Sequence, residues 1–472
     1  MQEKENLEVA ALRKLLEQDG ISTISVNNAV KNYARFLAGE TGYVPASEIK
    51  SVDDVVHYEE LINYAGFGEK ALSKVAIINL NGGLGTSMGL SSAKSLLNIK
   101  DGFSFLDITV AQVEYMRKKY EIDLPLLFMN SFSTDADTKA ELKDFENKGD
   151  LPVSFLQSKV RKIDLKTLRP VSHEEDRSLE WCPPGHGDVY AAMYQNGILD
   201  LLLEHGFEYI FISNVDNLGA TLDLNILGYL AKTAAPFIME VADRTEADKK
   251  GGHLARRKRD NRLILRELAQ CPENEQQEGG DFQNIRKYKY FNTNSLWLNI
   301  RSLKDLMDKT GGVMELPLIV NRKTVDPRDE TTTAVVQLET AMGAAISSFD
   351  EAVAVRVPRT RFAPVKSTDD LIVLRSDRYR LTPEKEIVLD VGCVGSAGIS
   401  IKLDKCFNKI DDFEARFSEG VPSMIACESL LIEGDFSFGS GVKLIGNVKL
   451  CNKTGAQVQI PAGAELKGKI SF

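Results

Sequence analysis

A glycine-rich loop directly after an apolar, strand-like run constrains this chain more than any other feature. The run Val75–Leu80 is apolar apart from Asn79, and residues 82–89 contain four glycines, with Lys94 shortly beyond. Glycines let a backbone approach a ligand closely and turn several N–H groups toward one point. A mobile positive charge beside such a loop favours phosphate binding. The glycines alone leave a tight strand-to-helix turn open as the alternative.

Two better-known glycine loops are excluded by spacing. The dinucleotide fingerprint G-x-G-x-x-G fails because Met88 stands where the third glycine should be, and Gly89 comes one residue late. The NTP-hydrolase loop G-x-x-x-x-G-K-[ST] fails because no lysine directly follows a glycine at that spacing. The loop therefore belongs to another class of phosphate or nucleotide site.

The loop and its surroundings resemble the opening signature of the UTP–glucose-1-phosphate uridylyltransferase family, the eukaryotic-type UDP-glucose pyrophosphorylases. The signature in this chain reads L-N-G-G-L-G-T-S-M-G-(x4)-K-S, beginning at Leu80. Six further blocks are similar to the family's blocks in the same order: Met129–Phe132, Pro183–Asp188, Ser213–Thr221, Phe291–Asn294, Gln337–Ala341 and Val357–Phe362. Seven ordered blocks spanning about residues 74–372 make a chance match very improbable, and a weaker similarity continues to the C-terminus.

Bulk properties agree with a large enzyme. The 58 basic and 68 acidic residues give a net charge of −10, which argues against a general nucleic-acid binder. The six cysteines show no C-x-x-C spacing, so neither zinc nor a disulfide framework is indicated. The N-terminus lacks an apolar signal core and no 18-residue apolar run is present, so we expect a cytoplasmic protein without a membrane span.

The pattern along the chain predicts an α/β architecture. Residues 1–70 are expected to form a mostly helical N-terminal region, because apolar residues recur at helical spacing within 7–15 and 55–62. From there, strands expected at 75–80, 124–129, 153–157, 208–213, 236–241 and 263–267 alternate with helices expected at about 107–120, 134–146, 188–204 and 223–233. This alternation predicts a doubly wound sheet in a catalytic domain of residues 71–380. The resemblance makes it a nucleotide-sugar-transferase-like mixed sheet.

The tail, residues 381–472, changes period. Two registers of apolar residues recur every six positions: Leu430, Phe436, Val442, Val448, Ile460 and Leu466 in one, and Ile432, Phe438, Leu444 and Leu450 in the other. This period is typical of β-helix coils, in which each side contributes one inward residue. An ordinary β-meander with accidental spacing is the alternative. The resemblance implies a C-terminal left-handed β-helix, through which a homo-oligomer could form.

The reaction that the resemblance implies needs charge stabilisation rather than a general base. The phosphate of glucose 1-phosphate attacks the α-phosphorus of UTP in line and expels pyrophosphate, and a phosphate with a second pKa of about 6 is already largely dianionic at neutral pH. The site must hold two polyanions together and neutralise the transition state. A divalent metal held by one carboxylate suits this task, and Mg²⁺ is the expected cofactor.

The resemblance implies a role for each matching residue. Asp216 is the expected metal ligand, and Lys94 and Lys366 are expected to contact the phosphates and steady the transferring α-phosphate, so these three carry the catalytic assignment. The expected UTP-binding residues are Leu80, Asn81, Gly82, Gly83, Lys94, Gln157, Gly185, Asp216 and Lys366. The expected sugar-binding residues are His186, Asn214, Val215, Glu267, Asn292 and Asn294. Gln157 is expected to read the uracil edge, because a side-chain amide offers both a donor and an acceptor.

Structural readings compete with three of these assignments. Lys94 could be a solvated lysine, His186 could cap nearby backbone, and Asp216 could be a turn or N-cap residue in its Asn-rich setting. The chain also departs from the family by carrying Ser92-Ala93, where Gly-Pro usually precedes the lysine, which leaves the loop's fine geometry open.

The sequence thus predicts a magnesium-dependent uridylyltransferase that uses UTP and glucose 1-phosphate. A pyrophosphorylase for another sugar 1-phosphate, such as N-acetylglucosamine or galactose, is the nearest alternative, although the Thr86–Met88 segment lacks the arginine that those relatives carry in this loop. A non-catalytic assembly protein of the same fold is the alternative from another class. The basic run Arg256–Arg259 is interpreted as a solvated hairpin tip rather than a nucleic-acid site.

Overall fold

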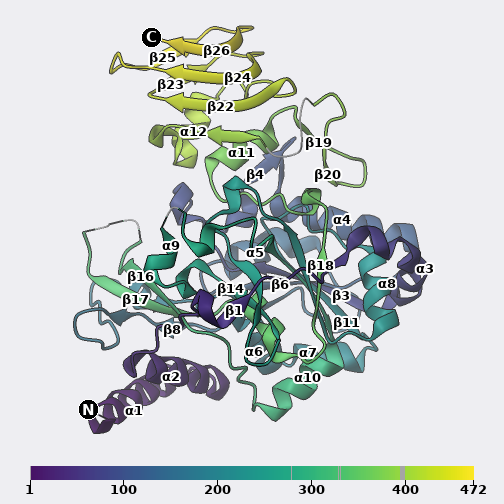
Figure 1. Ribbon diagram of the computed structural model, residues 1–472, viewed down its shortest axis with the longest axis vertical. Helices are drawn as coiled ribbons and strands as arrows, with labels where there is room; N and C mark the ends of the chain where they lie inside the picture. The colour runs from purple at the N-terminus through teal and green to yellow at the C-terminus, as the bar shows by residue number, and fades with distance from the viewer. Residues whose placement is uncertain (1, 278, 328, 330, 394–398) are drawn as a thin grey trace. The chain divides into compact units, whose positions relative to one another are not determined.

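The computed structural model describes residues 2–277, 279–327, 329, 331–393 and 399–472. The chain divides into two compact units that interleave along the sequence. Unit 1 comprises Met1–Gly82, Ile122–Asn214 and Leu222–Pro358, and unit 2 comprises Gly83–Glu121, Val215–Thr221 and Arg359–Phe472. Figure 1 follows the chain from its purple N-terminus to its yellow C-terminus. Each unit is described by itself.

An eleven-stranded mixed sheet forms the centre of unit 1. Its main path runs β2-β18-β12-β15-β11-β3-β6-β7, and β1, β13 and β14 extend from it as a side branch. The strands are β1 Ile49–Lys50, β2 Val56–His57, β3 Val75–Asn81, β6 Leu126–Asn130, β7 Ser154–Leu156, β11 Tyr209–Asn214, β12 Phe237–Asp243, β13 His253–Arg257, β14 Leu263–Arg266, β15 Tyr290–Asn299 and β18 Val353–Arg356. The six strands predicted from the sequence are all present in this sheet.

The central strands of the sheet are parallel and buried. β11, β3, β6 and β7 pair in parallel, whereas β15 runs antiparallel between β11 and β12. Every residue of β3 is buried, as is typical of a strand covered on both faces. The antiparallel strand β15 was not predicted, because asparagine and threonine interrupt its apolar run at 292–294.

The helices of unit 1 are mostly short. They are α1 Gln2–Gln18, α2 Thr23–Leu37, α3 Ala65–Ala71, α5 Asp135–Glu141, α6 Val189–Gln195, α7 Ile198–Glu204, α8 Leu224–Thr233, α9 Glu273–Gln276 and α10 Ile300–Lys309. The helix predicted at 188–204 is divided into α6 and α7 at Gly197, whose φ of 70° interrupts the helix. The helix predicted at 55–62 is wrong, because Val56 pairs with Val355 in the sheet and Tyr58–Tyr64 forms a 3₁₀-helix.

The two N-terminal helices pack on a separate small sheet of unit 1. This sheet has the order β16-β17-β9, with bounds β16 Ile319–Thr324, β17 Ala334–Glu339 and β9 Ile163–Asp164. Leu16 of α1 and Tyr33 of α2 are fully buried here, in one apolar cluster with Val336 of β17. β8 Val160–Arg161 and β10 Trp181–Cys182 form a two-stranded pair, and the two strands flank β9 in the sequence. The N-terminal region is therefore anchored to the β16-β17-β9 sheet of unit 1.

Unit 2 contains the glycine loop, a helical part and a stack of parallel strands. Its elements are β4 Asn98–Lys100, β5 Phe103–Ser104, α4 Phe105–Tyr120, α11 Thr368–Arg375, β19 Tyr379–Leu381, β20 Ile387–Leu389, β21 Ser400–Lys402, α12 Ile410–Arg416, β22 Cys427–Glu433, β23 Phe436–Phe438, β24 Lys443–Cys451, β25 Val458–Ile460 and β26 Glu465–Ser471. β21, β22, β24 and β26 form one parallel sheet, and β23 and β25 form another. All ten residues of the predicted six-residue registers are buried.

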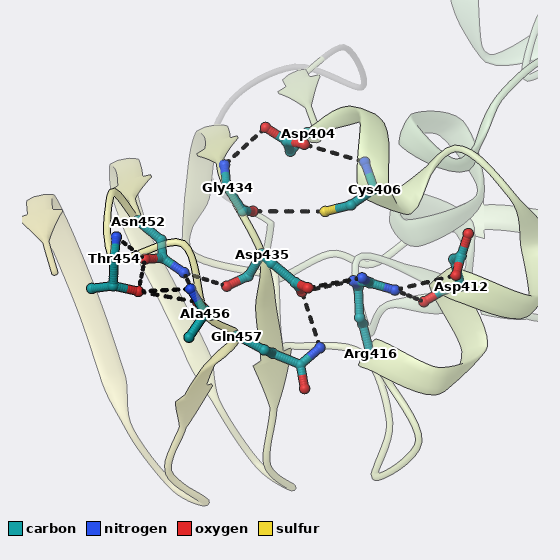
Figure 2. Close-up of polar contacts among 10 residues, drawn as sticks. All are labelled: Asp404, Cys406, Asp412, Arg416, Gly434, Asp435, Asn452, Thr454, Ala456 and Gln457. Atoms are coloured by element: carbon teal, nitrogen blue, oxygen red, sulfur yellow. Dashed lines mark hydrogen bonds and ion pairs between the residues drawn. The ribbon is translucent and has the colours of Figure 1, made fainter.

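A polar cluster fastens α12 to the strand stack (Figure 2). Arg416, the last residue of α12, donates from Nε and Nη2 to the two carboxylate oxygens of Asp435 at 2.9 and 3.0 Å. Asn452 donates from Nδ2 to the backbone oxygen of Asp435 at 2.7 Å. Because Asp435 and Asn452 occupy corresponding corners after β22 and β24, one residue links the helix to two successive turns of the stack.

The basic run lies at the tip of the β13–β14 hairpin of unit 1, as predicted. Arg256 pairs with Asp54 and Arg257 with Asp260, each at 2.6 Å. Within the described ranges, every helix is too short or too polar to cross a bilayer.

Candidate active site

The first part of the site lies at the carboxyl end of β3 in unit 1. Asn81 is 1% exposed and donates from Nδ2 to Asn130 at 2.9 Å and to Thr138 at 2.8 Å. Leu80, 7% exposed, pairs with Asn214 across the parallel β3–β11 ladder. Because these side chains are engaged inside the protein, the strand end offers backbone groups to a ligand, with Asn214 beside it.

Gln157 lies between two of the glycine motifs. Its Nε2 donates to the carbonyl of Gly185 at 2.8 Å, and a Cβ placed on Gly82 would lie only 2.8 Å from its Oε1. The residue is 8% exposed, and its own backbone N–H donates to Asn130 O at 2.8 Å. The structure therefore brings Gly82, Gln157 and Gly185 together as one neutral cluster with a fixed amide.

The Pro183–Asp188 turn is pressed against β17 and the segment after it. A Cβ on Gly185, whose φ is 81°, would lie 2.5 Å from Thr340 O, and Gly187 N–H donates to the same oxygen at 2.8 Å. Both positions therefore require glycine. His186 accepts the Met342 N–H at Nδ1 (3.1 Å), so its Nδ1 is not protonated. His186 therefore binds a nearby backbone N–H, as the capping alternative expected.

Asp188 is a residue of this turn that the sequence assignment missed. It is 1% exposed, and its Oδ2 accepts the N–H of Ser158 at 2.7 Å. Burial raises the pKa of its carboxyl to about 7. Its place inside the Pro183–Asp188 block was the signal that could have identified it.

Three of the six expected sugar-binding residues, Glu267, Asn292 and Asn294, lie at the β13–β14–β15 side of unit 1. A Cβ on Gly252 would collide with the Glu267 carboxylate, and Asn292 N–H donates to Gly252 O at 3.3 Å. Asn292 Nδ2 donates to Asn294 Oδ1 at 2.6 Å. Glu267 and Asn292 therefore both lie against Gly252, and Asn294 joins them through its hydrogen bond with Asn292.

A bulge in β15 sets the direction of Asn294. The register against β12 shifts between Met239 and Val241, and Asn294 has a φ of 60°. Bulges re-aim side chains beside functional sites, and asparagine tolerates this backbone region better than most residues. Thr293 secures the bulge by donating from Oγ1 to Glu240 O at 2.8 Å.

The charged part of the site lies in unit 2. Lys94 Nζ is 2.6 Å from Asp216 Oδ2, and the two side chains are 14% and 20% exposed. Lys94 Nζ also donates to the carbonyl of Val365, and its backbone N–H donates to Gly83 O at 3.1 Å. Lys94 is therefore not a freely solvated lysine in this structure. Ala93 has a φ of −55°, the value that the family's proline would impose.

The segment before Lys366 is fastened to the residues after β11. Val365 N–H donates to Asp216 O at 3.1 Å, and Ala363 N–H donates to Asn217 Oδ1 at 2.8 Å. Lys366 itself is exposed, and its backbone N–H donates to Asp370 at 2.7 Å. Val215 is 7% exposed and so offers mainly its backbone. Lys94, Asp216 and the Lys366 segment thus form one connected group.

The site residues therefore fall into two groups. Gly83, Lys94, Val215, Asp216 and Lys366 belong to unit 2, and the other ten belong to unit 1. Among the residues that the structure describes, no three His, Cys, Asp or Glu side chains gather into a metal-binding group. One carboxylate together with substrate phosphates is a common magnesium environment, so Asp216 alone fits that requirement.

Comparisons with known proteins point to one family. A family model described as UTP–glucose-1-phosphate uridylyltransferase matches residues 27–445. Curated relatives of that name include one from Saccharomyces cerevisiae, 42% identical over 89% of this chain and 82% of its own length. Another from Hordeum vulgare is 39% identical over 98% of this chain and 94% of its own.

Solved structures agree with the sequence relatives. A UDP-glucose phosphorylase from Trypanosoma brucei has a TM-score of 0.90 and 41% identity, covering 98% of this chain and 99% of its own. A Leishmania major UDP-glucose pyrophosphorylase variant in complex with UDP-glucose has a TM-score of 0.88 and 40% identity, with the same coverage. The chain therefore belongs to the UTP–glucose-1-phosphate uridylyltransferase family.

Proposed function

We propose that this chain makes UDP-glucose and pyrophosphate from UTP and glucose 1-phosphate. The observation that carries the proposal is the full-length similarity, at about 40% identity, to enzymes named for this reaction. Two parts of the site support it, because the cluster of Gly82, Gln157 and Gly185 is neutral and offers an oriented amide to a base, and the group of Lys94, Asp216 and Lys366 is charged and suited to phosphates.

The base-binding role falls to the neutral cluster of unit 1. Uracil presents an acceptor at O4 and a donor at N3, which one amide can satisfy together. Gln157 is held by Gly185 with its Nε2 and Oε1 in fixed directions, so the amide is already oriented before a ligand arrives. A preorganised group loses less freedom on binding and therefore contributes more affinity.

The phosphate-binding role falls to the glycine loop, Lys94 and Lys366. Loop N–H groups and the two lysines neutralise the triphosphate and the charge that develops as the α-phosphorus is attacked. The sugar phosphate needs no base to activate it, so no paired carboxylates are required. When phosphates bind, we expect Lys94 to exchange Asp216 for phosphate oxygens.

Mg²⁺ is the cofactor that we propose, with Asp216 as its ligand from the protein. Asp216 already holds a cationic group at 2.6 Å in this structure, so its carboxylate lies where a positive charge is stabilised. A bound divalent ion would supply Lewis-acid stabilisation of the transferring phosphoryl group. Once Lys94 has moved to the phosphates, the carboxylate of Asp216 has lost its cationic partner and requires another cation.

The sugar is assigned to Glu267, Asn292, Asn294 and His186. The carboxylate accepts hydrogen bonds from hydroxyls, and the amides both donate and accept them. The bulge of β15 aims Asn294 away from the regular strand. We propose glucose rather than N-acetylglucosamine or galactose as the preferred sugar.

The activity is tested by measuring pyrophosphate release from UTP with a panel of sugar 1-phosphates, with and without Mg²⁺. We expect glucose 1-phosphate to give the highest kcat/KM and a chelator to abolish the reaction. Release with none of the sugars would overturn the assignment and favour the non-catalytic assembly protein.

The remaining assignments are proposals about organisation. We propose that the parallel stack of unit 2 is a left-handed β-helix through which copies of the chain associate, which light scattering on the full chain and on a deletion of the stack would test. The division into 1–70, 71–380 and 381–472 stays a prediction. It rests on how the pattern of apolar residues changes along the sequence. All six cysteines are free thiols, which supports a cytoplasmic location.

A further inference from the structure

Ser158, the residue after Gln157, is the centre of a buried hydrogen-bond network in unit 1. Its N–H donates to Asp188 Oδ2 at 2.7 Å, and its hydroxyl lies 2.8 Å from the hydroxyl of Ser25. Gln195 Nε2 donates to the same hydroxyl at 3.2 Å. Ser158 and Ser25 are 7% and 4% exposed, so water competes little with these bonds.

The network joins the first turn of α2 to both ends of α6. Gln195 Oε1 accepts from Ser22 Oγ at 2.6 Å and from Ser25 Oγ at 2.8 Å. Gln195 is the last residue of α6, and Asp188 directly precedes its first. Ser22 and Ser25 are the N-cap of α2 and the residue that it caps. The N-terminal helical pair is therefore bonded directly to the segment that carries Gln157.

The residues on both sides of Gln157 are held by these ends of α6. Asn196, just after α6, donates from Nδ2 to Leu156 O at 3.1 Å, while Asp188 holds the Ser158 amide. Gln157 itself bonds through its N–H to Asn130. With three successive residues fixed, the amide of Gln157 is directed at Gly185, and rotation by 180° would break that bond.

The direction of this amide matters for the choice of base. Uracil has an acceptor at position 4 and a donor at N3, whereas cytosine has a donor and an acceptor at the same places. An amide rotated by 180° presents the complementary pattern, so only a fixed amide can discriminate between the two. A site built to hydrogen-bond one pattern rejects the other because its buried groups are left unpaired.

We propose that Ser25 and Gln195, together with Asp188, are positioning residues that fix the Gln157 amide and thereby set the preference for UTP over CTP. This inference rests on the proposed function, in which Gln157 reads the base. None of the three residues needs to touch the nucleotide. The N-terminal helices are then part of the specificity mechanism and not only a cover for β17.

The test compares variants of the network with a matched control on the same helix. Ser25→Ala and Gln195→Leu remove the bonds to Ser158, and Asp188→Ala removes the acceptor of its N–H. Tyr33→Phe is the control, because it removes the bond from Tyr33 Oη to Leu168 O (2.6 Å) and loosens α2 at a point outside the network. Gln157→Ala serves as the reference for complete loss of base reading.

We expect the ratio of kcat/KM for UTP to that for CTP to fall about tenfold in the Ser25→Ala/Gln195→Leu double variant, because Ser158 then loses its side-chain hydrogen bonds to α2 and α6. The loss should appear in KM for UTP rather than in kcat. Asp188→Asn, which retains an acceptor oxygen, should restore most of the ratio that Asp188→Ala loses. Calorimetry with UMP and CMP should show the same loss of preference without turnover.

Three outcomes separate the possibilities. An unchanged ratio in folded network variants, when Gln157→Ala abolishes the preference, would overturn the inference and leave the proposed function intact. A ratio that Tyr33→Phe lowers as much as the network variants do would also overturn it, because general loosening of α2 would then be the cause. A wild-type chain that uses neither nucleotide would overturn the proposed function itself.

Discussion

The neutral cluster of Gly82, Gln157 and Gly185 in unit 1 and the charged group of Lys94, Asp216 and Lys366 in unit 2 are built in different ways. Gln157 is 8% exposed and already makes the contacts that orient its amide. Lys94 and Asp216 remain 14% and 20% exposed, and each satisfies the other's charge. The first cluster is ready for its ligand, whereas the second has to exchange partners to bind one.

The difference fits what each group is proposed to bind. A base is recognised by weak, directional hydrogen bonds, and these depend on rigid donors and acceptors. A triphosphate arrives with several charges, so it can compete for lysines that are held by an internal carboxylate. The internal ion pair keeps Lys94 and Asp216 near their working positions without leaving an unpaired charge in a partly buried site.

Breaking the charged group at its carboxylate should have the largest effect. Asp216→Asn keeps the shape but removes the charge that holds Lys94 and the proposed metal ion, so we expect kcat/KM to fall by about 10³ or more. The half-saturating Mg²⁺ concentration should rise in a metal titration. Asp260→Asn is the control, because it breaks a hairpin-tip ion pair of the same 2.6 Å length away from the site. A reduced rate with unchanged metal dependence would indicate a structural aspartate.

Removing the exposed lysine of the same group should cost somewhat less. If Lys366 stabilises charge that grows only in the transition state, Lys366→Ala lowers kcat by about 10²–10³ while KM for UTP changes little. The fixed backbone around Val365 should preserve the rest of the segment. Steady-state kinetics with varied UTP distinguish the two roles of Lys366. A loss confined to KM would show that Lys366 binds only the ground state.

The neutral cluster is tested by crowding it. A Cβ on Gly82 would lie 2.8 Å from Gln157 Oε1, so Gly82→Ala has to displace an amide that Gly185 holds. We expect KM for UTP to rise about tenfold with a small change in kcat, because only binding geometry is disturbed. Among the described residues, apart from its two chain neighbours, none lies within 4 Å of a Cβ placed on Gly83, so Gly83→Ala should cost less. Equal losses in both variants would mean that the substrate, and not Gln157, is crowded.

Part of the fold could be predicted from the sequence, and part could not. Hydrophobic period located six strands and the buried registers of the tail, because burial of apolar faces dictates both patterns. It missed β15, where asparagine and threonine satisfy their polar groups through the bulge and the contact with Glu240. It also predicted a helix at 55–62, which is wrong. The pairing of Val56 with Val355 joins positions far apart in the chain, and a local pattern does not show it.

The candidate site shows the same division. The resemblance assigned roles to Lys94 and Asp216, because each lies within one contiguous block of the sequence. The bond between Ser25 and Ser158 spans 133 residues, and no local pattern marks either serine. Remote segments that hold a site residue come together only in the folded chain, so these contacts could not be predicted from the sequence.

Asp188, which supports the neutral cluster, gives a smaller effect that depends on pH. Its folded pKa of about 7 lies above the value of about 3.9 for an unfolded aspartate, so the folded chain retains a proton between these values. The contribution of Asp188 to stability is therefore highest below about pH 4, falls as the pH rises toward 7, and levels off above it.

Asp188→Asn removes this titration. We expect the unfolding free energy of the wild type relative to Asp188→Asn to fall by about 2–4 kcal/mol from pH 4 to pH 7. Thermal unfolding midpoints of both proteins across this range provide the measurement. Parallel curves for the two proteins would show that the buried carboxyl does not carry the proton.

The strand stack of unit 2 should affect the site least of all. Every proposed site residue lies between 80 and 366, and the stack is fastened locally through Arg416 and Asp435 (Figure 2). A deletion from Leu430, where the sequence period begins, would cut β22 in two. Deleting residues 443–472 instead removes β24, β25 and β26 and keeps the Arg416–Asp435 contact.

We expect the shortened chain to bind UTP within about threefold of the full chain, because successive turns of a stack bury their apolar residues mainly against one another. Leu430 and Ile432 lose their cover from β24, so solubility should fall and self-association should change. Calorimetry with UTP on the monodisperse fraction, with circular dichroism to show that the remainder is folded, tests the prediction. Loss of UTP binding by a folded, shortened chain would contradict it and make the stack a third component of the binding site.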